Sequence, residues 1–207
     1  MSVTRVVRPV WRRFRERDLA KAVVYARTGG GSLVVAEDGG IRMLFALVAQ
    51  DIPELFLWSI LDLEKRKWSR VKEGLAAGLG ESVIPRRKHW VAERWMERDG
   101  ARPGPVATIV LDCLDCGACC KDSKVVLDAD DLLRWKRAGR PELTRSPHVK
   151  RVGEKLFMPM STQGPCKHLE GDNKCDIYAL RPFNCSAFPA GSEPCLGTRE
   201  DTLGIVD

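Results

Sequence analysis

The stretch Cys113-Leu-Asp-Cys116-Gly-Ala-Cys119-Cys120 places four thiols within eight residues. Thiolates are soft, anionic ligands, so a concentration of them in one half of a chain favours soft metal ions. Two residues between cysteines let a tight turn direct both sulfurs at one point, as zinc knuckles and iron–sulfur loops do. The stretch therefore predicts a metal-stabilised fold for the second half of the chain, which also holds the other four cysteines, Cys166, Cys175, Cys185 and Cys195.

Two features inside this stretch bear on how it binds metal. Gly117 stands where a turn can require a positive φ or a close approach of the backbone. Neighbouring residues point in different directions in both helices and strands, so the side chains of Cys119 and Cys120 are expected to diverge. We infer that these two cysteines serve different metal sites, or that one is a ligand and the other is packed.

The size and composition of the chain are those of a globular protein. Its 207 residues suffice for one good core or two small domains, and 44% of them are hydrophobic. The N-terminus lacks the apolar core of a secretory signal, so we expect a cytoplasmic, reducing environment in which metal ligation is favoured over disulfides. No membrane span is expected, because the most apolar region, 44–63, is interrupted by Gln50, Asp51, Pro53, Glu54 and Asp62.

The net charge of +6 is unevenly distributed along the chain. Residues 1–110 hold 20 Lys and Arg against 13 Asp and Glu, whereas residues 111–207 hold 14 against 15. An arginine-rich arm can contact nucleic acid or an acidic partner. A solvated, partly frayed terminus is the interpretation that we favour for the arm here, which carries Arg5, Arg8, Arg12, Arg13, Arg15 and Arg17.

The overall pattern predicts an α+β chain in two parts. The segment Gly100-Ala-Arg-Pro-Gly-Pro105 cannot continue a helix and is the best linker in the sequence. We place a domain boundary there, between a basic, helix-rich N-terminal region of unknown role (1–104) and a small, irregular, metal-stabilised cysteine-rich domain (105–207).

Local signals predict the elements of the N-terminal region. Asp38-Gly39-Gly40 is typical of a hairpin turn between two strands. Asp51, with Glu54 three residues later, is a capping arrangement that begins the longest helix. In chain order, the expected elements are a helix over 18–27, strands over 32–36 and 41–47, a helix over 51–75 and a helix over 85–99.

The cysteine-rich domain is expected to hold fewer regular elements. Asp128 is the predicted N-cap of a helix, with Asp131 at the third helical position. A hairpin is predicted around Gly153-Glu154. The strands expected here are 107–111, 124–127, 149–152 and 155–158. The remaining chain buries too few apolar groups to hold itself, so metal ligation is expected to contribute to its folding free energy.

The spacing of the cysteines leaves the metal open between zinc and iron. Structural zinc sites pair two short Cys-x-x-Cys knuckles, but eight or nine residues separate neighbours in the second cysteine group. Cys113, Cys116 and Cys119 match the first three positions of a bacterial ferredoxin run, whose fourth position here is Ser123. The chain is therefore not a ferredoxin, although a remote cysteine could complete a four-iron, four-sulfur (4Fe–4S) cluster.

The second cysteine group lies in a recognisable frame, Gly-Pro-Cys166-Lys-His-Leu-Glu followed by Cys175-Asp-Ile-Tyr178-Ala-Leu-Arg181-Pro182-Phe-Asn-Cys185. With the Cys-x-x-Cys-x-x-Cys-Cys stretch, it resembles the YkgJ-type cysteine-cluster family, described as a zinc- or iron-chelating domain, over about residues 110–195. The resemblance implies that all eight cysteines are metal ligands. Ser186 departs from the family, whose members usually carry arginine after that cysteine. The frame is also similar to that of flagellin lysine methylases, but the chain lacks a glycine-rich S-adenosylmethionine loop.

Tyr178 and Arg181 are three residues apart and share a face on a helical turn. They could donate to cluster sulfurs as supporting cofactor-binding residues. We favour a structural interpretation, in which the tyrosine packs on the cluster and the arginine caps carbonyls or pairs with Asp176 or Glu170. We interpret His168 as a surface or packed histidine rather than a ligand.

These observations support two functional hypotheses. The first is an iron–sulfur protein with a 4Fe–4S cluster on Cys113, Cys116, Cys119 and one distal cysteine, serving electron transfer or cluster-assisted modification of a protein. Its partner would be an unidentified redox protein or protein substrate. The second is a non-catalytic module stabilised by Zn²⁺, which contacts nucleic acid or an acidic partner through its basic N-terminal region. No catalytic residue is assigned under either hypothesis.

Overall fold

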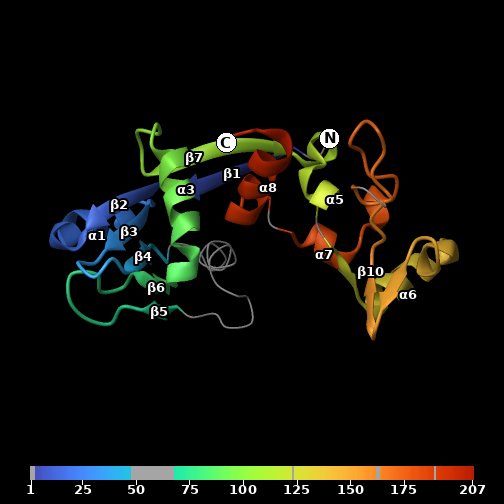
Figure 1. Cartoon of the computed structure of the whole chain (residues 1–207), viewed down its shortest axis with the longest axis horizontal. Helices are drawn as coiled ribbons and strands as arrows, with labels where there is room; N and C mark the ends of the chain where they lie inside the picture. The colour runs from blue at the N-terminus through green and yellow to red at the C-terminus, as the bar shows by residue number, and fades with distance from the viewer. Residues whose placement is uncertain (1–2, 48–67, 123, 162–163, 189) are drawn as a thin grey trace. The chain divides into compact units, whose positions relative to one another are not determined.

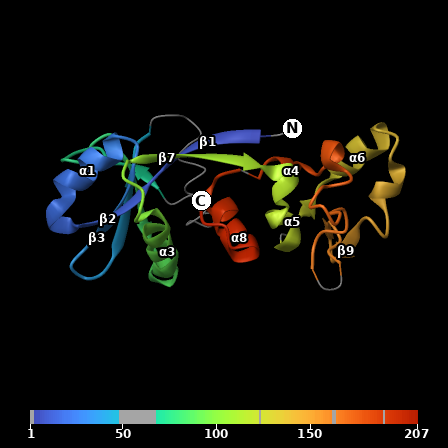
Figure 2. The ribbon, with the colours of Figure 1, turned by 90° about the horizontal axis from the view of Figure 1, so that it is seen from above.

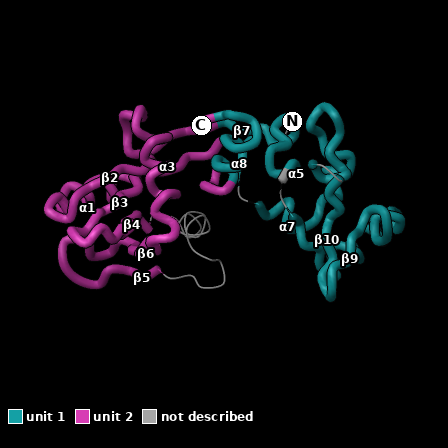
Figure 3. The backbone as a smooth tube through the Cα atoms, in the orientation of Figure 1, with its two compact units in different colours: residues 1–4, 110–190, 195–205 teal, residues 5–109, 191–194, 206–207 magenta. Residues whose placement is uncertain are grey.

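A computed structural model describes residues 3–47, 68–122, 124–161, 164–188 and 190–207 (Figure 1). The chain forms two compact units (Figure 3). The N-terminal unit comprises Arg5–Ile109, Gly191–Pro194 and Val206–Asp207. The cysteine-rich unit comprises Met1–Thr4, Val110–Ala190 and Cys195–Ile205.

The described part of the N-terminal unit is built on a five-stranded sheet with the strand order β2-β3-β4-β6-β5. β2 and β3 are parallel, and the other neighbouring pairs are antiparallel. The parallel pair needs a crossover, which α1 (Leu19–Arg27) supplies. The strands are β2 (Trp11–Arg15), β3 (Gly31–Val35), β4 (Ile41–Phe45), β5 (Ser69–Arg70) and β6 (Gly80–Ile84).

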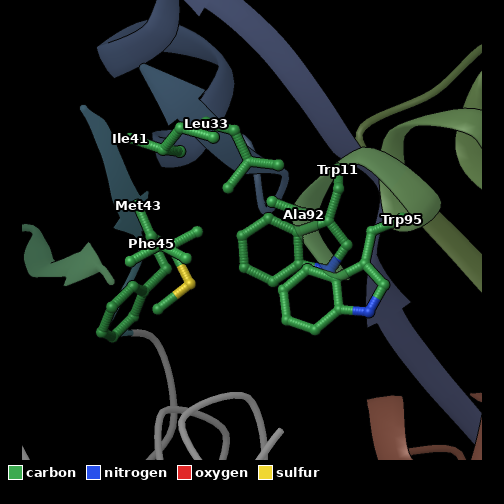
Figure 4. Packing of buried hydrophobic residues seen from close by; sticks show 8 residues of the cluster. Trp11, Leu33, Ile41, Met43, Phe45, Ala92 and Trp95 are labelled. Atoms are coloured by element: carbon green, nitrogen blue, oxygen red, sulfur yellow. The ribbon is translucent and has the colours of Figure 1, made fainter. Parts of the chain in front are cut away.

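Helices cover both faces of this sheet. Successive strand residues point to opposite faces, and Leu33 and Val34 of β3 accordingly belong to two different hydrophobic clusters. The cluster of Val34 includes Ala22 and Ala26 of α1. The cluster of Leu33 includes Trp95 of α3 (His89–Asp99), which stacks on Trp11 with ring centroids 5.0 Å apart (Figure 4).

The structure corrects the expectation of a helix-rich N-terminal region, because the described N-terminal part is rich in strands. The helices at 18–27 and 85–99 and the hairpin at Asp38-Gly39-Gly40 are confirmed. The predicted helix over 51–75 lies mostly outside the described residues, and its last part is wrong, since β5 and turns occupy it.

The arginine-rich arm is not a frayed terminus but forms β1 (Val3–Pro9) and β2. The arginines of the arm differ in burial: Arg13 of β2 is exposed, whereas Arg8 of β1 is 1% exposed. β1 pairs with β7 (Val106–Asp112), which confirms the strand predicted at 107–111.

A buried network of ion pairs ties α3 to the strands of the N-terminal unit. Arg8 and Asp99 are 1% and 0% exposed, and Nη2 of Arg8 lies 2.5 Å from Oδ1 of Asp99. Arg98 contacts the carboxylates of both Asp99 and Glu193, at 3.0 and 2.5 Å. The indole Nε1 of Trp11 donates to Glu193 at 2.9 Å, so each of the two buried carboxylates has cationic and neutral donors.

The cysteine-rich unit contains a small antiparallel sheet in the order β8-β10-β9, formed by Val126–Leu127, Lys155–Phe157 and Lys150–Val152. The hairpin predicted around Gly153-Glu154 is therefore confirmed. The helix predicted after Asp128 is α6 (Ala129–Arg137), and Asp128 and Asp131 form a reciprocal capping box. The core of this unit is Leu127, Trp135, Leu143, Met158 and Ile177.

Within the ranges given above, the structure shows no helix with the length and apolar character needed to cross a membrane.

Candidate metal centre

The first cysteine group lies on two short helices that follow β7. The side chain of Asp112 caps α4 (Cys113–Cys116) by accepting a hydrogen bond from the backbone N–H of Leu114 at 2.9 Å. Gly117 then reverses the chain into α5 (Ala118–Asp122) with a φ of +59°. The expected positive φ of this glycine is confirmed, and it separates the two helices that carry the thiols.

Gly117 also meets the second condition that favours glycine, a close approach of other atoms. A Cβ at this position would lie 3.0 Å from Cβ of Asn173 and 3.3 Å from Cδ1 of Leu169. The cysteine loop therefore packs directly against the segment between the first two distal cysteines, Cys166 and Cys175.

Backbone pairing positions two of the distal cysteines, and helices carry the other two. The N–H of Cys166 donates to the carbonyl of Cys120 at 2.7 Å, which joins the two cysteine groups. Cys175 forms an isolated bridge with Leu169. Cys185 lies on α7 (Phe183–Ser186), and the last cysteine, Cys195, lies on α8 (Glu193–Leu203).

All the predicted site residues line one cavity of about 410 Å³ within the cysteine-rich unit, namely the eight cysteines, Tyr178 and Arg181. All eight cysteines are free thiols, of which Cys113 is exposed and the others are half-buried. Figure 2 shows α8 beside α4 and α5, which together carry five of these cysteines. The thiols surround a space rather than a point: over the described ranges, no three His, Cys, Asp or Glu side chains are grouped closely enough for one metal ion.

The structure does not show the expected divergence of Cys119 and Cys120. Their thiols are in hydrogen-bonding contact, and this contact is the main cause that lowers the pKa of Cys119 and raises the pKa of Cys120. Both side chains line the cavity, although they are neighbours on the short helix α5. Proximity of the two sulfurs therefore comes from the local packing and not from the helical repeat.

Arg181 and Tyr178 share a face, as predicted from their spacing. The guanidinium carbon of Arg181 lies 4.2 Å from the centroid of the Tyr178 ring, a cation–π contact. Burial raises the pKa of the Cys113, Cys175 and Cys185 thiols, that of Cys185 to about 12, and the charge of Arg181 opposes this rise. The arginine therefore favours thiolates in the cavity while the tyrosine holds it in place.

Sequence reasoning missed a second arginine at the cavity. Nη1 of Arg199 on α8 donates to Sγ of Cys116 at 3.0 Å, and the arginine is only 9% exposed. A signal for it was present in the sequence, because Arg199 follows Cys195 by four residues and such pairs share a helix face.

His168 lines the cavity and is 3% exposed, which agrees with a packed histidine. Its Nδ1 lies 2.8 Å from Oδ1 of Asp176, and its Nε2 lies 3.3 Å from Nδ1 of His148. The rings of His148 and His168 stack with centroids 5.1 Å apart. This Asp–His–His chain was also missed, because no short-range pattern connects His148 to a residue 20 positions away.

Eight thiols and two arginines surround one cavity, an arrangement typical of a cysteine-cluster metal-binding domain. In a comparison with known proteins, residues 112–202 match the family model described as "CxxCxxCC: Putative zinc- or iron-chelating domain". The match supports metal binding by this region, and it contains all eight cysteines. No curated protein and no solved structure matches the chain.

Proposed function

We propose that the cysteine-rich unit holds a 4Fe–4S cluster on Cys113, Cys116, Cys119 and one distal cysteine, and that the protein transfers electrons to a redox partner. The observation that carries the proposal is the gathering of eight free thiols from α4, α5, the 166–175 loop, α7 and α8 around one cavity. A bound cluster would supply a one-electron redox centre.

The cysteine thiols of the cavity are suitable ligands for a 4Fe–4S cluster. Thiolates are the ligands that iron–sulfur clusters require, and the cavity presents more of them than one cluster needs. Cys113 and Cys116 lie on one helical turn, and Gly117 redirects the chain so that Cys119 follows on the next turn. Because the thiols surround a space, metal binding would draw them together and add its free energy to that of folding.

The two arginines suit an anionic centre. Arg199 donates to Cys116, and the charge of Arg181 acts on the thiols of Cys113 and Cys119. Hydrogen bonds and cations near ligand sulfurs stabilise the thiolate form and raise the reduction potential of a cluster. A reducing compartment such as the cytoplasm would keep unloaded thiols available for metal.

Zinc is the second candidate, favoured by the packing of the distal cysteines. Cys166 and Cys175 pack against the core that contains Trp135 and Ile177, so a metal ion bound there would stabilise the fold of the unit. In that case the domain is redox-silent, and the protein is an interaction module whose basic N-terminal unit contacts nucleic acid or an acidic partner.

The test is metal and sulfide analysis, with a visible spectrum, of protein purified without oxygen. Iron with equivalent acid-labile sulfide and a brown colour that bleaches on reduction supports the cluster. A colourless protein with only zinc contradicts it.

A substitution assigns the cluster to the predicted ligands. Cys113→Ser is expected to abolish the visible absorption, whereas Leu133→Ser is expected to retain it. Leu133 is a matched control because it lies on α6 in the same unit, is 46% exposed and does not line the cavity. Retention of both metal and fold in the Cys113→Ser protein contradicts the assignment of Cys113.

A further inference from the structure

We propose that the eight cysteines are divided between two adjacent metal sites of four thiols each. The first site is formed by Cys113, Cys116, Cys119 and Cys195, and the second by Cys120, Cys166, Cys175 and Cys185. This inference deepens the proposed function, on which it rests, because it names the distal cysteine of the cluster and gives the other four thiols a metal of their own.

Arg199 places Cys195 at the first site. Residues four apart in a helix lie one above the other on the same face, so Cys195 and Arg199 share a face of α8. Nη1 of Arg199 reaches Sγ of Cys116 at 3.0 Å, and this contact directs that face of α8 at α4. Cys195 therefore lies near Cys116, and both line the same cavity.

The other members of the first site are neighbours along α4 and α5. Cys113 and Cys116 are three residues apart on α4 and share its face. Cys119 follows on α5, and all three cysteines line the same cavity.

The second site is held by different parts of the unit. The hydrogen bond from the N–H of Cys166 to the carbonyl of Cys120, at 2.7 Å, brings these two residues together. Cys166 and Cys175 pack against the same hydrophobic core. Asn184, next to Cys185 on α7, donates to the carbonyl of Val126 at 2.7 Å, which anchors Cys185 to the sheet of that core.

Cys119 is the point where the two sets meet, because a peptide bond joins it to Cys120 and the thiols of the two residues are in contact.

Arg181 lines the same cavity as both sets of thiols, and a cation there favours the thiolate form of either set. Arg199 contacts Cys116, which belongs to the first set.

The test replaces each cysteine in turn by serine in the full chain and measures iron, zinc and acid-labile sulfide per chain, with circular dichroism as the check of folding. The variants are expected to fall into two groups of four. A variant in either group is expected to lose the metal of the site that contains the replaced cysteine and to retain the metal of the other site. The decisive pair is Cys195→Ser and Cys185→Ser, which must lose different metals; loss of the same metal in both, or unchanged metal in Cys195→Ser, overturns the division.

A titration that needs no variant covers the case in which a variant fails to fold. Metal-free, reduced wild-type protein is titrated with Co²⁺, whose binding to thiolates produces a charge-transfer absorption. We expect the absorption to rise until two equivalents have been added, with four thiols protected from alkylation per ion. Saturation at one equivalent overturns the proposal.

The outcomes distinguish a failure of the two-site proposal from a failure of the proposed iron–sulfur function. Two zinc ions in the protein as purified, with the variants in two groups, contradict the iron–sulfur function and support two sites. A single cluster with four thiols that remain reactive supports the function and contradicts the second site.

Discussion

Arg199 on α8 donates a hydrogen bond from Nη1 to Sγ of Cys116 on α4, at 3.0 Å and across 83 positions of the chain. The bond connects the last helix to the first turn of the cysteine loop, and it involves a side chain that is only 9% exposed. A buried guanidinium at a ligand sulfur stabilises the thiolate that a metal requires.

Arg199→Gln is expected to weaken metal binding by about 10-fold or more, because loss of a group that supports a metal ligand typically has this effect. Arg199→Lys keeps the charge and is expected to lose less. The measurement is competition with a chelator under anaerobic conditions. Arg137→Gln, an exposed position on α6, is the control. Equal metal affinity in Arg199→Gln and wild type contradicts the role of this contact.

Gly117→Ala tests whether the cysteine loop depends on glycine for its backbone, its close packing or both. The φ of +59° costs a non-glycine residue about 1–2 kcal/mol. The new Cβ would also lie 3.0 Å from Cβ of Asn173, tighter than ordinary contact, so the loop must shift. We expect a loss of metal content together with a lower thermal midpoint.

Gly153→Ala is a matched control, because Gly153 has the same φ of +59° in the β9–β10 turn and no atom within 4 Å of the added Cβ. Gly153→Ala is expected to lower the stability only by the free-energy cost of a positive φ, and to leave the metal content unchanged. Equal effects of the two substitutions would mean that the approach of Asn173 is unimportant.

Asp99→Asn is expected to destabilise the N-terminal unit by about 3–5 kcal/mol, because it leaves buried Arg8 and Arg98 without their shared carboxylate. Urea unfolding of the metal-loaded protein measures the change. Glu81→Gln breaks a half-exposed ion pair with Arg42 in the same unit and is expected to cost less than about 1 kcal/mol. Similar losses in the two variants contradict the importance of the buried network.

The stability that Asp99 contributes should depend on pH. Burial raises the pKa of Asp99, but hydrogen bonds from Arg8 and Arg98 outweigh burial and hold the pKa below its ordinary value. A carboxyl with a lowered folded pKa stabilises the protein above its unfolded pKa, about 3.9, and loses that contribution as the pH falls through the folded value. The difference between wild type and Asp99→Asn is therefore constant near pH 7 and shrinks below about pH 4. A difference that grows on acidification contradicts this assignment.

The elements that were predicted correctly depend on short-range signals. The capping box of Asp128 and Asp131 and the hairpin at Gly153-Glu154 involve residues only a few positions apart, so local geometry determines them. The β2 strand was missed because its arginines resemble a solvated arm. Both faces of β2 are in fact covered, because Trp11 packs in the cluster that contains Trp95 of α3 and Phe14 packs against the cluster that contains Ala22 of α1.

The sequence by itself determined the chemistry of this protein: eight thiols, their close spacing in the first group, and a glycine between two helical turns. Ligand type and turn geometry are local properties, so they can be inferred from the sequence without knowledge of the tertiary structure. Only the tertiary structure decided which distant groups meet. It brought Arg199 to Cys116, His148 to His168, and Cys195 to the cavity, because such contacts depend on how whole elements pack and not on any spacing along the chain.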